Sequence, residues 1–204
     1  MNINIKTFNN WAETGKDQSM ERGHSSAVNQ MFKILKQETP RLNSSFSFID
    51  IGCGNGWVIR KILENKHCFH ALGIDGAENM IKKALSYKTG NFIQADIEKF
   101  NFNQKFDIIF SMETLYYLNN IDDFIDKMYH TGINDKGSLI IGIDHYKENT
   151  STLNWDKEYN LETNTLSIKE WYEKLSKYQF SKIKKYQYGQ KENWEGTLIL
   201  YAQK

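Results

Sequence analysis

Three glycines at alternate positions follow an apolar stretch, and their spacing could serve ligand binding. The stretch Phe46–Ile51 has the length of a buried strand, and Gly52, Gly54 and Gly56 come directly after it. Apolar residues at helical spacing continue from Val58. Glycine permits positive φ and a close approach of ligand to backbone, and a helix N-terminus offers unpaired N–H groups. The segment therefore predicts a site for a small polar or anionic cofactor.

The spacing of the glycines separates the possible cofactors. A dinucleotide-binding loop, G-x-G-x-x-G, would need glycine at position 57, where this chain has Trp57. A phosphate-binding P-loop ends in Gly-Lys and then Ser or Thr, and no lysine comes directly after Gly56. The pattern that remains is D-x-G-x-G-x-G, which begins at Asp50. An ordinary glycine-rich turn between a strand and a helix is the alternative interpretation.

This pattern resembles the first motif of class I S-adenosylmethionine-dependent methyltransferases of the small-molecule type (similar to methyltransferase domains 11 and 25). In that family the loop holds the methionine end of the cofactor. The resemblance implies S-adenosyl-L-methionine as cofactor and S-adenosyl-L-homocysteine as product. It also implies that the chain is an enzyme, a methyltransferase, whose cofactor-binding loop residues are Asp50, Gly52, Cys53, Gly54, Asn55 and Gly56.

Acidic residues follow two further strand-like segments. Asp75 ends the segment that begins at Phe69, and a carboxylate at that edge can accept hydrogen bonds from both hydroxyls of a ribose. Gly76, directly after Asp75, has no side chain that would obstruct a ligand there. Asp96 follows the next segment, Phe92–Ala95. A cap at the end of a strand is the simpler role for a single acid, but the order and spacing after the glycine loop favour the cofactor.

The resemblance assigns roles to five positions outside the glycine loop. Met80 corresponds to the residue that packs on the adenine, Asp96 to an acid that bonds the adenine amino group, and Ile97 to a residue that lines the ring. Ser111 and Met112 fall at the cofactor edge of a fourth strand. The resemblance covers roughly residues 45–146 motif by motif and the remainder by pattern only.

Candidates for the chemistry of methyl transfer are fewer. A base is needed only if the acceptor carries its proton at neutral pH, and histidine titrates near that pH. His24 and His145 are therefore the candidate catalytic residues, although a packing role is more frequent for a lone histidine. Tyr116 and Tyr117 are candidate substrate residues, with core packing as the alternative. Glu21 and Glu113 could orient a cationic acceptor.

The elements that must position these residues alternate along the chain. Strands and helices in alternation predict an α/β fold, a doubly wound, Rossmann-like, mostly parallel seven-stranded sheet with helices on both faces. We expect one domain over residues 1–204, with an N-terminal helical lid at 1–44, an α/β core at 45–204 and a substrate loop at about 145–166. A helix near Ala27–Leu35 is expected to be capped by Ser25 or Ser26.

Composition limits the functional classes. The chain has 204 residues, enough for one α/β domain, and 40% hydrophobic with 14% aromatic residues indicates a folded globule. A net charge of +1 provides no strong field for nucleic acid or an acidic membrane. Cys53 and Cys68 are too few for a disulfide framework, so we expect no metal and a reduced, cytoplasmic setting. The first residues lack the apolar core of a signal peptide, and no segment has the length of a membrane span.

The sequence indicates only the class of molecule that would accept the methyl group. The fourth motif reads Ser-Met-Glu-Thr from Ser111, which differs from the Asn/Asp-Pro-Pro-Tyr of enzymes that methylate exocyclic amines of bases or glutamine. We therefore expect a small-molecule acceptor as partner, with no nucleic acid and no membrane. A methyltransferase of RNA or protein, a non-catalytic S-adenosylmethionine-binding regulator and a nucleotide-dependent oxidoreductase are the alternatives.

Overall fold

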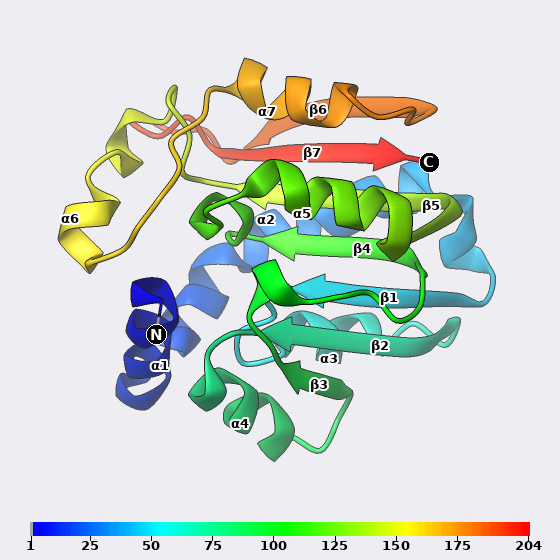
Figure 1. The fold of residues 1–204 in the computed structure, drawn as a ribbon, viewed down its shortest axis with the longest axis horizontal. Helices are drawn as coiled ribbons and strands as arrows, with labels where there is room; N and C mark the ends of the chain where they lie inside the picture. Colours follow the sequence, from blue (N-terminus) through cyan, green and yellow to red (C-terminus); the bar gives the residue numbers. More distant parts are fainter. Residues whose placement is uncertain (1) are drawn as a thin grey trace.

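The computed structural model describes residues 2–204, which form one mixed sheet with helices on both sides (Figure 1). The strands lie in the order β3-β2-β1-β4-β5-β7-β6, and β7 runs antiparallel to both of its neighbours while the other pairs are parallel. The predicted seven-stranded, mostly parallel sheet is thereby confirmed. Its strands are β1 (Phe46–Ile51), β2 (Cys68–Asp75), β3 (Asn91–Gln94), β4 (Phe106–Met112), β5 (Ile133–Ile143), β6 (Lys182–Tyr188) and β7 (Thr197–Gln203).

Helices cover the two faces and the edge at which the parallel strands end. The helices are α1 (Ile3–Thr14), α2 (Lys16–Glu38), α3 (Trp57–Ile62), α4 (Glu78–Ser86), α5 (Ile121–Lys127), α6 (Trp155–Tyr159) and α7 (Ile168–Ser176). In Figure 1, α5 and α7 lie in front of the sheet and α2 and α3 behind it, while α1 and α6 lie beyond the carboxyl ends of the parallel strands. None of the helices in residues 2–204 combines the length and the apolar character that crossing a membrane would need.

Each face of the sheet has its own apolar core. The core on the α5 and α7 side contains Phe124 and Trp171, packed on alternate residues of the central strands such as Ile109. The core on the α2 and α3 side contains Met31 and Ile59. The central strands β1 and β4 are buried along their whole length, because helices cover both of their faces. This double packing fixes the carboxyl ends of both strands, so the residues directly after β1 and β4 start from well-anchored positions.

The N-terminal segment is more helical than the sequence pattern indicated. Residues 11–17, which have a polar, turn-like composition, contain the end of α1 and the start of α2, with only Gly15 between them at φ 79°. The expected cap at Ser25 or Ser26 is wrong, because both lie inside α2. The error arose because the residues from Lys16 to Ser26 are mostly polar, so the apolar period of this long helix becomes clear only from Ala27 onward.

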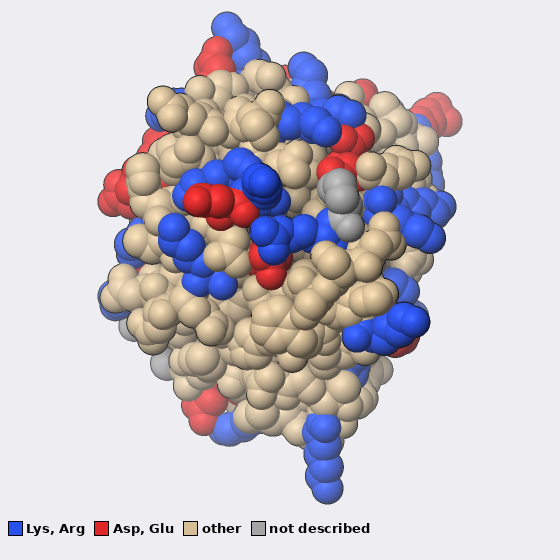
Figure 2. Space-filling view, turned by 90° about the vertical axis from the view of Figure 1, so that its right-hand side faces the viewer, with Lys and Arg blue, Asp and Glu red and all other residues tan. Residues whose placement is uncertain are grey.

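The order of the strands determines where a ligand can bind. The chain proceeds from β1 outward through β2 to β3 on one side, and from β4 outward through β5 on the other. In open α/β sheets a crevice forms at such a reversal, outside the carboxyl ends of the strands. At the opposite end of the sheet, basic and acidic side chains lie interspersed on the surface (Figure 2). A binding crevice is therefore expected at the end where β1 and β4 finish.

Candidate functional site

A cavity lies at the carboxyl ends of β1, β2 and β4, under helices α1 and α2. Eleven of the cofactor residues predicted from the sequence line it. Those from the glycine loop and the end of β1 are Asp50, Gly52, Cys53, Gly54 and Asn55. Those from the neighbouring segments are Asp75, Gly76, Met80, Asp96, Ile97 and Met112. The arrangement therefore gathers into one place residues that separate strand ends supply.

The three glycines of the loop differ in what they do. Gly52 and Gly56 both have φ 79°, and a Cβ atom at either would overlap a neighbouring side chain, Thr114 or Phe92 respectively. Gly54 has φ 51°, and no atom lies within 4 Å of where its Cβ would be. Two glycines are thus required by the packing of the loop, while the third leaves open space that faces the cavity.

Asp75 joins the end of β2 to the glycine loop. Its Oδ2 accepts a hydrogen bond from Gly54 N–H at 2.9 Å and its Oδ1 accepts one from Ala77 N–H at 2.8 Å. Burial raises the pKa of Asp75, and these two backbone donors act against that shift. Each carboxylate oxygen keeps a lone pair, so Asp75 can accept a further pair of hydrogen bonds from a diol.

Asp50, the acid at the start of the glycine loop, is buried, with 2% of its surface exposed. Burial, and then the negative charge of Asp75, raise the pKa of Asp50 well above its ordinary value. Two acids so close together favour a ligand that brings hydrogen-bond donors or positive charge. S-adenosylmethionine offers both, since it has ribose hydroxyls and a sulfonium.

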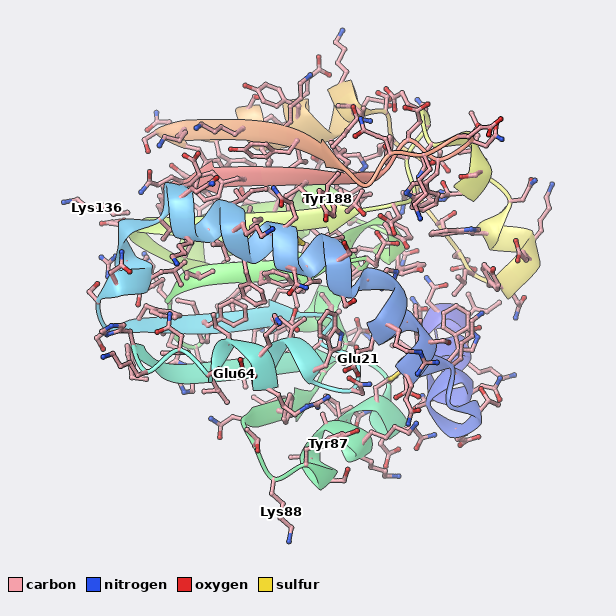
Figure 3. The ribbon with its side chains drawn as sticks, turned by 180° about the vertical axis from the view of Figure 1, so that it is seen from behind. Glu21, Glu64, Tyr87, Lys88, Lys136 and Tyr188 are labelled. Carbon is pink, nitrogen blue, oxygen red and sulfur yellow. The ribbon has the colours of Figure 1, made fainter. Side chains whose placement is uncertain are left out.

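The first turns of α2 are tied to the loop through Asn55. Its Nδ2 donates to Asp17 Oδ2 at 3.1 Å and to Glu21 Oε2 at 3.0 Å, and Lys83 Nζ donates to Asp17 Oδ1 at 2.7 Å. Figure 3 shows Glu21 at the end of α2 next to α1, far from Lys136 at the other end of the sheet. The sequence analysis missed Asp17. The spacing of Asp17 and Glu21, one helical turn apart, is the signal that could have indicated it.

Helix α1 closes the cavity beside Asp75. Ile5 lies so close to Gly76 that a Cβ on this glycine would be 2.9 Å from the Ile5 side chain. Phe8 of α1 also lines the cavity, and its ring packs edge-on against Tyr117 with centroids 5.2 Å apart. These apolar contacts were not predicted, because residues 3–14 show no recognisable motif.

Four predicted site residues do not line the cavity. Gly56 serves the turn, and Ser111 is buried with its Oγ donating to the Ile51 carbonyl at 3.0 Å. Tyr116 is fully buried and donates to Glu113 Oε2 at 2.7 Å. His145 is fully buried, with Nδ1 3.0 Å from the Thr152 carbonyl and Nε2 2.8 Å from Thr165 Oγ1. Both ring nitrogens of His145 are occupied, so its geometry fits the packing role rather than that of a base.

The other candidates meet at one end of the same cavity, beside the glycine loop. His24, Glu113 and Tyr117 all line it, and His24 Nε2 lies 3.8 Å from Asp144 Oδ2. Glu113 follows β4 at φ 54°, a left-handed conformation that is uncommon for residues other than glycine. Its Oε1 accepts the backbone N–H of Asp144, which follows β5. This end of the cavity is thus acidic and polar, and it adjoins the glycine loop.

Comparison with known proteins gives the same family. Residues 49–141 match the family model for a methyltransferase domain. A malonyl-[acyl-carrier protein] O-methyltransferase of Calditerrivibrio nitroreducens is 32% identical over 83 residues, which are 41% of this chain and 32% of the relative. The chain therefore matches about a third of the length of this curated relative.

Solved structures share the whole fold at low identity. A chain from the complex between the Haloferax volcanii Trm112 methyltransferase activator and a methyltransferase has a TM-score of 0.81 at 20% identity, covering 96% of both chains. The DhpI complex with S-adenosylhomocysteine (SAH) has a TM-score of 0.72 at 14% identity, covering 97% of this chain and 93% of the other. Residues 49–141 thus match a methyltransferase domain, and the chain as a whole shares its fold with solved methyltransferases.

Proposed function

We propose that this protein transfers a methyl group from S-adenosylmethionine to a small-molecule acceptor. The observation that carries the proposal is the continuity of one cavity. It contains the open space at Gly54 and the free lone pairs of Asp75, and it extends to His24, Glu113 and Tyr117. A protein that only binds the cofactor would not need a second, chemically different end.

The proposed roles of the residues follow from their positions. Asp75 would accept from the ribose, Met80 and Ile97 would cover the adenine, and Asp96 would bond its amino group. The backbone at Gly54, with Asp50 nearby, would hold the methionine end. When bound, the cofactor supplies a sulfonium methyl that is already activated toward displacement. The chain then has to align an acceptor atom about 3 Å from that carbon and exclude water.

Helices α1 and α2 would act as the lid that was expected at residues 1–44. The support for this role is that both helices line the cavity and that Asn55 tethers α2 to the glycine loop. His24, on α2, is the remaining candidate for a base. Burial lowers the pKa of His24 and the neighbouring Asp144 opposes that shift, so an imidazole able to accept a proton is favoured.

Two measurements test the proposal. Calorimetry with S-adenosylhomocysteine tests the cofactor end, and we expect binding that competes with S-adenosylmethionine. Incubation of the protein with S-adenosylmethionine and a metabolite extract, followed by mass spectrometry, tests the acceptor end through a product heavier by one methylene. Binding without any methylated product would favour the non-catalytic regulator, and methylated RNA or protein would favour a polymer acceptor.

A further inference from the structure

Three ionisable side chains from distant parts of the chain meet beside the place where the acceptor would lie. His24 and Glu113 line that cavity, whereas Asp144 lies 3.8 Å from His24 and lines a second cavity. His24 comes from α2, Glu113 follows β4 and Asp144 follows β5. Each offers one nitrogen or carboxylate oxygen atom, and these atoms all lie within 4.8 Å of one another. Glu113 and Asp144 are 8% and 4% exposed. We call His24, Glu113 and Asp144 the acidic triad.

The acidic triad has more negative charge than its described neighbours neutralise. Burial and then the charge of Asp144 raise the pKa of Glu113 well above its ordinary value. Asp144 Oδ1 is buried and has no hydrogen-bond donor among residues 2–204. A buried carboxylate oxygen without a donor is costly in free energy, and a ligand with N–H groups or positive charge would satisfy it.

The geometry points to a basic amine as the acceptor, so that the methyl transfer proposed above is an N-methylation. This inference rests on the proposed function and names its substrate class. The acidic triad would accept hydrogen bonds from the ammonium form of the substrate. Phe8 and Tyr117, which line the first cavity together with His24 and Glu113, would face its positive charge or its apolar part.

Distances favour a nitrogen over a zinc or magnesium ion. An ammonium nitrogen donates its hydrogen bonds at tetrahedral angles. With a nitrogen–acceptor distance of about 2.8 Å, two of its acceptors lie about 4.6 Å from each other. A zinc or magnesium ion, about 2.0–2.2 Å from its ligands, would bring those ligands to about 3–3.5 Å from one another. His24 Nε2 and Asp144 Oδ2 are 3.8 Å apart, already wider than that.

The acidic triad also supplies the proton acceptor that such a reaction needs. The ammonium gives one proton to the triad. The lone pair that this frees forms the new N–C bond as the S–C bond of the sulfonium donor breaks, and the sulfonium becomes a neutral thioether. His24 and Asp144 also line a second cavity on the far side, toward Tyr188 and Trp194, through which the proton can leave to solvent. An anionic acceptor would instead be repelled by two buried carboxylates.

The test compares two probes of matched shape on the protein saturated with S-adenosylhomocysteine. The probes are 2-phenylethylamine, a cation, and 3-phenylpropionate, an anion. Calorimetry should show at least about tenfold tighter binding of the amine, and Asp144→Asn should weaken amine binding about ten- to hundredfold, because a charged hydrogen-bond partner is lost. Asp135→Asn removes the same charge from an exposed site at the start of β5 and should leave amine binding unchanged.

Several outcomes would overturn the amine assignment. These are equal or tighter binding of the carboxylate, no preference between the probes, or tight binding of Mn²⁺ that Asp144→Asn abolishes. If Asp144→Asn does not fold, Glu113→Gln and His24→Gln replace it, with the same expected loss of amine binding. Binding of S-adenosylhomocysteine is measured on each sample. If the unmodified protein binds S-adenosylhomocysteine but the methylated product is not an amine, only the amine assignment is refuted. If the unmodified protein does not bind S-adenosylhomocysteine, the proposed function is refuted.

Discussion

The two ends of the cavity are built in different ways. At the proposed cofactor end, the contacts come from backbone groups and from short side chains directly after β1 and β2, within residues 50–80. At the proposed acceptor end, His24 and Glu113 line the cavity with Asp144 beside His24, and the three come from segments far apart in the sequence. The first end depends on local conformation, and the second depends on the packing of α2 against the sheet. Substitutions at the two ends should therefore have different consequences.

The largest effect is expected at Gly54. A valine here must adopt φ 51° and would fill the open space that faces the cavity. The strain should lower the free energy of unfolding by about 1–2 kcal/mol, while affinity for S-adenosylhomocysteine should fall by at least about 100-fold, since a ligand overlap exceeds about 3 kcal/mol. Gly189→Val is the matched control, because Gly189 has φ 79° and equally open space but follows β6. Near-normal affinity in Gly54→Val would place the cofactor elsewhere.

Asp75 should show the next largest effect. Asp75→Ala removes the proposed ribose acceptor, and each charged hydrogen bond contributes about 1.5–3 kcal/mol with partial replacement by water. Cofactor affinity should therefore fall about 30- to 1000-fold. The variant should also melt earlier, since Gly54 N–H and Ala77 N–H lose their acceptor. Asp75→Asn should be milder in both measurements.

A variant of Asp107 serves as the control that separates an effect on cofactor binding from an effect on stability. Asp107 lies at the opposite end of the sheet, where its carboxylate accepts hydrogen bonds from Arg41, Ser47 and Asn134. Asp107→Ala should lower the melting temperature without changing cofactor affinity. If Asp75→Ala behaved like Asp107→Ala, Asp75 would be a structural cap only.

These differences explain what the sequence could predict. The glycine loop, Asp75 and the parallel sheet follow from local rules, because a strand, a tight turn and a helix determine their own geometry. His145 illustrates the limit, since a histidine after a strand gives no sign that Thr152 and Thr165 will occupy both its nitrogens. The acidic triad requires knowledge of how α2 packs across the sheet, and no periodicity in residues 16–38 contains that information.

A moderate effect is expected where the two ends are joined, at Asn55. Asn55→Ala removes the donor shared by Asp17 and Glu21, so the first turns of α2 should open more often and S-adenosylhomocysteine should dissociate about tenfold faster. Stopped-flow displacement measures that rate. Glu38→Gln provides the control, because it weakens ion pairs with Lys182 and Lys184 at the other end of α2 and should leave the dissociation rate unchanged.

The smallest effect, and the one that depends on pH, concerns Asp50. Its folded-state pKa lies above the ordinary 3.8, so between these values the folded protein binds more protons than the unfolded chain. Stability contributed by this group is present at low pH and is lost as pH rises through that window. Asparagine does not titrate, so Asp50→Asn should gain stability relative to the unmodified protein as pH rises. At pH 7 the difference in melting temperature should reach about 2–4 °C, which corresponds to about 1 kcal/mol for a chain of this size.

The comparison is made by calorimetry of both proteins from pH 4 to pH 8, with Asp135→Asn as the exposed control for a change in net charge. Asp135 is exposed, so its replacement changes the net charge by the same amount without altering a buried site. If Asp50→Asn instead lost stability as pH rose, the carboxylate would be stabilised as an anion by the fold itself. Its burial beside Asp75 would then not favour a cationic or donor-rich ligand. A gain in stability together with weaker cofactor binding would mean that the repulsion is retained because the ligand relieves it.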